Sequence, residues 1–210
     1  MKHSINQTLY AYWNEVRKGR PAPRRFEIEP AHIASILPNT FILERIDSET
    51  FRFRLAGTAL AELFGVELRD ANFLTCFGGD HRETVERLLA TVTLHCGAGL
   101  LTCSAGGPDG TKTEFEVLLL PLVHTRGGVD RVVGALSPAP VPLEIASEPL
   151  TPWALDHSQV IWPDGHPQPL ADPVNAQVPF LPHIRRARIV RQDRRQFRVY
   201  DGGLSAPPKP

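Results

Sequence analysis

The spacing of hydrophobic and polar residues changes abruptly within residues 51–65. Apolar side chains alternate with arginines over residues 51–55, which predicts a half-buried strand. From Thr58 the apolar spacing becomes helical, with Thr58 as the expected N-cap and Gly65 as the C-terminal stop. So short a turn from strand to helix indicates that Gly57 provides a close backbone approach or a positive φ.

Four further segments have the composition of strands, and turn residues separate them. Residues 39–46 and 51–57 flank the polar turn DSET, so together they predict an antiparallel hairpin. Glu114 and Glu116 alternate with apolar residues, which predicts a strand with one wet face. Three strands are expected after the hairpin, separated by GGPDG and HTRGGVD, at residues 100–105, 113–123 and 131–137.

Helical spacing of the apolar residues predicts the remaining elements. The pairs Ser4/Gln7 and Asp80/Glu83 have the spacing of side-chain caps at the start of two of these helices. The predicted helices cover residues 4–18, two turns between Pro30 and Pro38, residues 58–64 and residues 81–96.

The order of these elements defines the expected fold class. Two strands, then helices, then three strands indicate an α+β domain with one five-stranded antiparallel sheet. We expect the strand order 2-1-5-4-3, with the helix over residues 81–96 on the concave face of the sheet.

Composition narrows the class of protein. The 210 residues are 42% hydrophobic, which is ordinary for a globular domain. Lys plus Arg and Asp plus Glu are both 23, so the balanced charge argues against a surface coated by nucleic acid or membrane. No apolar run approaches the roughly 20 residues of a membrane span, and the N-terminus lacks a secretory pattern, so we expect a cytoplasmic protein.

Proline placement divides the chain. Nine prolines fall between Pro138 and Pro173, which predicts that the compact domain ends near residue 137. The expected parts are a flanking helix over 1–20, a sheet domain over 21–137, a Pro-rich linker over 138–182 and an Arg-rich tail over 183–210.

Several short motifs between residues 9 and 137 resemble a family of bacterial single-domain PAS regulatory proteins. The motifs are Trp13, Pro30, Leu37-Pro38, residues 53–58, Phe64-Gly65, Phe73 and residues 119–122. The resemblance implies a sensory and protein-interaction module without catalytic residues. It also implies a small apolar ligand, or none, between the concave sheet face and the helices.

The implied ligand pocket has eleven candidate residues, each of which fits a plain core position equally well. They are Phe41, Phe53, Leu55, Leu60, Leu63, Phe64, Phe73, Leu89, Val92, Val117 and Leu119.

The first helix carries one apolar stripe, formed by Leu9, Tyr12, Trp13 and Val16. This stripe can pack on its own sheet, on the same helix of a second chain, or on another protein. The family resemblance favours the second arrangement, a homodimer, with a different signalling partner as the alternative.

Catalytic and cofactor chemistry has weaker support in the sequence. His95 lies where some PAS domains hold haem, but on helical spacing it flanks the apolar stripe, so we expect no cofactor. Cys76, Cys96 and Cys103 have no CxxC spacing and no third group that would orient a Cys–His dyad, so no metal site and no enzyme is predicted. A phosphate loop at Gly57 lacks the required glycine motif.

The C-terminal tail is rich in arginine and has interleaved apolar residues. It predicts a polar β-hairpin with QDRR as its turn. The alternative is an arginine surface that binds an acidic partner or nucleic acid, although a basic patch alone is a weak signal. Its arginines are Arg185, Arg186, Arg188, Arg191, Arg194, Arg195 and Arg198.

Overall fold

The protein forms two compact units, Met1–Ala176 and Gln177–Pro210, in the computed structural model. The structure describes residues 1–64, 67–106, 112–124, 128–138, 152–168, 189–192 and 198–200.

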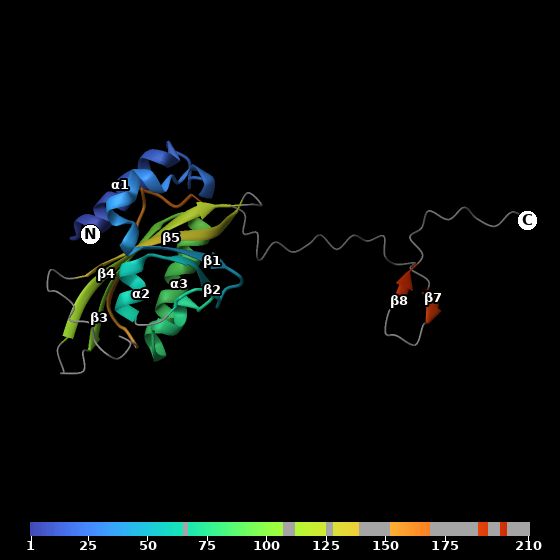
Figure 1. Ribbon diagram of the computed structural model, residues 1–210. Helices are drawn as coiled ribbons and strands as arrows, with labels where there is room; N and C mark the ends of the chain where they lie inside the picture. Colours follow the sequence, from blue (N-terminus) through green and yellow to red (C-terminus); the bar gives the residue numbers. More distant parts are fainter. Residues whose placement is uncertain are drawn as a thin grey trace, which may run out of the picture. The chain divides into compact units, whose positions relative to one another are not determined.

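The first unit is built on one antiparallel sheet with the strand order β2-β1-β5-β4-β3-β6 (Figure 1). The expected order of the first five strands is therefore confirmed. A sixth strand pairs with β3, so the prediction of five strands is one short. This strand lies inside the segment predicted to be a Pro-rich linker. The strands are β1 Thr40–Arg45, β2 Phe51–Ala56, β3 Ala98–Gly106, β4 Lys112–Val123, β5 Val129–Pro138 and β6 Ala154–Ile161.

Strand β4 is buried on both sides. Phe115, Val117 and Leu119 belong to one hydrophobic cluster, and Leu118 and Leu120 belong to the other. A strand covered on both faces has a continuous apolar run instead of an alternating one, and the sequence FEVLLLPL fits that rule. We call the first side of the sheet the α3 face and the second side the α1 face.

Helices cover both faces of the sheet. On the α1 face, Leu9 and Trp13 of the first helix join the cluster together with Ile33 and Ile36. On the α3 face, α3 lies against the sheet and α2 contributes Leu60. The helical elements are α1 Ser4–Arg17, η1 Arg25–Glu27, η2 Pro30–Asn39, α2 Thr58–Phe64, η3 Phe73–Cys76 and α3 Gly79–His95.

Neither predicted capping pair forms. Helix α3 begins at Gly79, with Gly78 as an N-cap that offers no side chain. Helix α1 is capped by a distant residue, because the buried carboxylate of Glu116 on β4 accepts the backbone N–H of Lys2 at 3.0 Å and of His3 at 3.4 Å. Glu116 is 3% exposed, so the prediction that this side of the strand faces solvent is wrong at Glu116. The prediction is correct at Glu114, which is exposed.

Replacing Glu116 tests this cap. Glu116→Gln keeps the size of the side chain but removes the charge that strengthens its bonds to the first backbone N–H groups. We expect the free energy of unfolding to fall by roughly 1–2 kcal/mol in urea titration. Glu114→Gln, two residues away and exposed, is the control and should be close to neutral. Equal effects of the two substitutions would contradict the cap.

The turn at Gly57 depends on close packing of backbone, not on a positive φ. A Cβ at this position would collide with the carbonyl oxygens of Leu37 and Pro38 at the end of η2. Gly57 also donates its N–H to the carbonyl of Thr40 at 2.8 Å and accepts the first bonds of α2 through its own carbonyl. Gly57 therefore takes the N-cap position predicted for Thr58.

Gly57→Ala is expected to destabilise the domain by roughly 1–3 kcal/mol, because the backbone atoms that it meets cannot rotate away. Gly106→Ala is a matched control on β3, where an added Cβ meets nothing within 4 Å. Denaturation midpoints of the two variants should separate clearly. A common midpoint close to that of the parent protein would show that η2 can move aside.

The described part of the second unit is a two-stranded hairpin. Strand β7, Ile189–Gln192, pairs antiparallel with β8, Arg198–Tyr200. The predicted hairpin is confirmed in these strands, which carry Arg191 and Arg198. The predicted turn extends beyond the described residues, as do Arg185, Arg186, Arg188, Arg194 and Arg195.

Candidate ligand site

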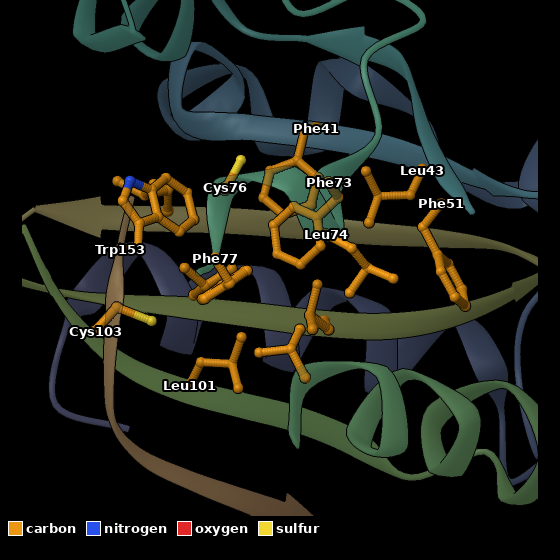
Figure 2. Packing of buried hydrophobic residues seen from close by; sticks show 14 of the residues in the cluster. Phe41, Leu43, Phe51, Phe73, Leu74, Cys76, Phe77, Leu101, Cys103 and Trp153 are labelled. Atoms are coloured by element: carbon orange, nitrogen blue, oxygen red, sulfur yellow. The ribbon is translucent and has the colours of Figure 1, made fainter. Parts of the chain in front are cut away.

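An aromatic cluster fills the space between the sheet and the helices on the α3 face (Figure 2). Phe41 of β1, Phe53 of β2 and Phe73 of η3 form a triangle of rings whose centroids lie 5.6–5.8 Å apart. A Cβ at Gly134 would collide with the ring of Phe41, so this glycine allows the ring to lie across β5. Rings from three elements therefore fix the positions of those elements relative to one another.

Eight of the eleven predicted pocket residues lie in this cluster. The prediction of Leu55 is wrong, because its side chain is 50% exposed. The side chains of Leu63 and Phe64 lie outside the part of the chain that the structure describes. The eight residues are Phe41, Phe53, Leu60, Phe73, Leu89, Val92, Val117 and Leu119.

A β-bulge explains the position of Leu55. Phe53 pairs with Leu43, and both side chains point into the α3-face cluster. The register then shifts, and Leu55 pairs with Ile42, which packs on the α1-face cluster instead. The extra residue in β2 reverses the alternation of its side chains, so Leu55 points away from the pocket at the edge of the sheet.

The site also contains an aromatic side chain that sequence reasoning missed. Trp153 precedes β6 and is 2% exposed. Its ring lies 4.9 Å from Phe115, 5.3 Å from Phe77 and 6.3 Å from Phe73, measured between centroids. Its backbone N–H donates to the carbonyl of Cys76 at 2.7 Å. Figure 2 shows the indole beside Phe77 and Cys76.

The three cysteines are free and buried. Burial raises the pKa of Cys76, Cys96 and Cys103 to about 12 in each case, so the thiols stay protonated at neutral pH. A protonated thiol is a poor nucleophile. Cys76 and Cys103 therefore act as small apolar members of the α3-face cluster, and Cys96 belongs to the other cluster.

The two histidines considered for cofactor or nucleophile chemistry lie at the surface. His95 is exposed at the last residue of α3, outside the α3-face cluster. His124 is exposed as well. Among the described residues, no three His, Cys, Asp or Glu side chains are grouped so that they could hold a metal ion.

The apolar stripe of α1 packs on its own sheet, so the prediction that Leu9 and Trp13 face a partner is wrong. Leu9 is 1% exposed and Trp13 is fully buried. The indole N–H of Trp13 donates to the carbonyl of Pro121 on β4 at 2.9 Å. Tyr12 and Val16 are half-buried and line a surface groove together with Phe26 of η1.

This fold is that of a sensory domain class. A family model described as a PAS domain matches residues 1–137, and the chain belongs to the PAS domain family. The match runs from α1 through most of β5 and ends before β6. Within the described residues, no helix is both long and apolar enough to cross a membrane.

Solved structures of light-oxygen-voltage domains resemble the chain at low identity. One is a light-oxygen-voltage domain solved with a flavin analogue, at 13% identity, TM-score 0.38, and coverage of 52% of this chain and 82% of that chain. Another is the light state of the LOV domain of the blue-light photoreceptor Aureochrome1, at 13% identity, TM-score 0.39, and coverage of 53% and 88%. No curated protein sequence matches the chain.

Proposed function

We propose that this chain is a PAS sensory module that binds a small apolar ligand on the α3 face and transmits that binding through protein contacts. The observation that carries the proposal is the α3-face cluster itself. It joins apolar side chains from the sheet, α2, η3 and α3, and its centre is a set of aromatic rings. Apolar surfaces with aromatic walls are typical of small-molecule sites.

A catalytic function has less support from the same residues. The thiols that could act as nucleophiles are protonated at neutral pH because burial raises each pKa to about 12. PAS domains are also generally regulatory. The Arg-rich tail leaves nucleic acid as the rival function, but the balanced net charge of the chain gives it no further support.

Native mass spectrometry of the protein purified from its own host tests the ligand. We expect the native mass to exceed the denatured mass by that of a small molecule. Protein refolded from denaturant and then incubated with the low-molecular-weight fraction of the host should recover the same excess. Native and denatured masses that agree in both preparations would argue against a ligand-binding function.

We further propose that the protein partner is a second copy of the chain, which docks on the groove lined by Tyr12, Val16 and Phe26. Phe26 is 70% exposed, and the groove also contains Glu29 and His32. Two half-buried residues of α1 and one exposed aromatic ring give this surface an apolar centre with a polar rim, which suits an interface. PAS domains commonly dimerise through a flanking helix, which agrees with this position.

Phe26→Ser should shift the protein from dimer to monomer without lowering its melting temperature, because the ring is largely exposed in one chain. Light scattering after gel filtration measures the change, and we expect at least a ten-fold weaker association. Leu55→Ser removes another exposed apolar residue, on β2, and should leave the oligomeric state unchanged. A parent protein that is already monomeric at high micromolar concentration would exclude the homodimer.

A further inference from the structure

The segment over residues 152–168, which we call the strap, lies outside the part of the chain that matches the PAS family. Its strand β6 is eight residues long, pairs antiparallel with β3 and forms that edge of the sheet. Among residues 152–168, Trp153 alone is buried. The strap is therefore attached by a backbone ladder at the sheet edge, by the buried Trp153, and by Leu155 and Val160, which are partly buried against the α3-face cluster.

The place occupied by Trp153, which we call the indole seat, has a defined geometry. The rings of Phe77, Phe115 and Phe73 stand at 88°, 73° and 77° to the plane of the indole. Edge-to-face contact of this kind favours a flat aromatic guest over an aliphatic one of equal volume. The seat thus fits a flat bicyclic aromatic molecule.

The strap has further attachments outside the indole seat. Asp164 receives two N–H bonds from Arg17 at 2.7 Å each, and Lys112 pairs with Asp156 at 3.1 Å on the surface. Val160 and Trp162 lie over Gly97, where an added Cβ would meet them at 2.7 and 2.8 Å. The exposed Lys112–Asp156 pair contributes little to stability. The strap is therefore held by its ladder with β3, by the buried side chain of Trp153 and by the bonds of Asp164 to the buried Arg17.

We propose that Trp153 occupies the ligand site of this PAS domain from within the chain, and that a flat aromatic molecule of about the size of indole displaces it and releases the strap. The proposal rests on the ligand-binding function proposed above and adds the class of ligand and its consequence. Ligand and Trp153 cannot share the indole seat. We call the form of the chain in which the strap is released the open form. Because the ligand binds only the open form, adding ligand raises the population of chains with a released strap.

Hydrogen–deuterium exchange of the full chain, with indole as the probe, tests this release directly. Peptides from β6 should exchange at least ten-fold faster than peptides from β4, the central strand. At ten times its dissociation constant for the open form, indole should raise exchange in β6 about eleven-fold, because the open population grows as 1 + [L]/Kd. Exchange in β4 should not increase. If β6 and β4 exchange together, or if indole leaves β6 unchanged, the proposal is wrong.

A pair of tryptophan variants in the full chain tests the seat independently. Trp153→Ala should stay folded by circular dichroism and bind indole, with a rise in melting temperature. Trp13→Ala removes an equally buried indole from the α1 face and should be strongly destabilised with no rescue by indole. Loss of folding in Trp153→Ala to the same degree as in Trp13→Ala would show that Trp153 is ordinary core, and would overturn the proposal.

The two experiments also separate this proposal from the function on which it rests. If Trp153→Ala binds indole but indole never increases β6 exchange in the parent protein, the α3 face is a ligand site and the strap is not its switch. If folded Trp153→Ala does not bind indole, the α3 face is not a site for flat aromatic molecules of this size and the displacement proposal fails, whereas the ligand-binding function is decided by the native mass measurement.

Discussion

Burial of strand β4 on both sides is the constraint on which the rest of the first unit depends. The side chains of Val117 and Leu119 need cover on one face, and those of Leu118 and Leu120 need cover on the other. One layer of helices cannot provide both. Helix α3 covers the first face, so α1 and η2 must cover the second. Leu9 and Trp13 of α1 meet this requirement, which is why Trp13 lies in the core and not in an interface.

Local patterns predicted the strands and helices well, because each strand has a hydrophobic run bounded by turn residues. Eight of the candidate residues lie in the α3-face cluster, because period-2 spacing in strands and helical spacing in helices indicate which face a side chain occupies. The errors arise where a distant residue decides the local structure. Glu116 caps a helix more than a hundred positions away, and a bulge opposite Ile42 and Leu43 turns Leu55 outward. Neither partner can be identified from the neighbouring sequence.

The missed strand β6 has a different cause. Proline density predicted a linker, yet the prolines flank the strand at Pro152 and Pro163 and leave residues 153–162 free of them. A proline-free window satisfies the requirement of an edge strand, because proline only removes ladder bonds where it occurs. Counting prolines over the whole segment concealed this window. The position of Trp153 in the seat depends on tertiary packing and could not be predicted from spacing.

The strap also connects the two faces of the sheet at one edge. Trp153 is buried on the α3 face, while Asp164 pairs with Arg17 near the end of α1. The side chain of Arg17 is only 5% exposed, and its bonds to Asp164 lower the pKa of that carboxyl. Release of the strap would leave a buried guanidinium without its carboxylate, which is costly, so the last turn of α1 would have to rearrange. Displacement of one indole on the α3 face thus has a direct physical route to the α1 surface proposed for partner contact.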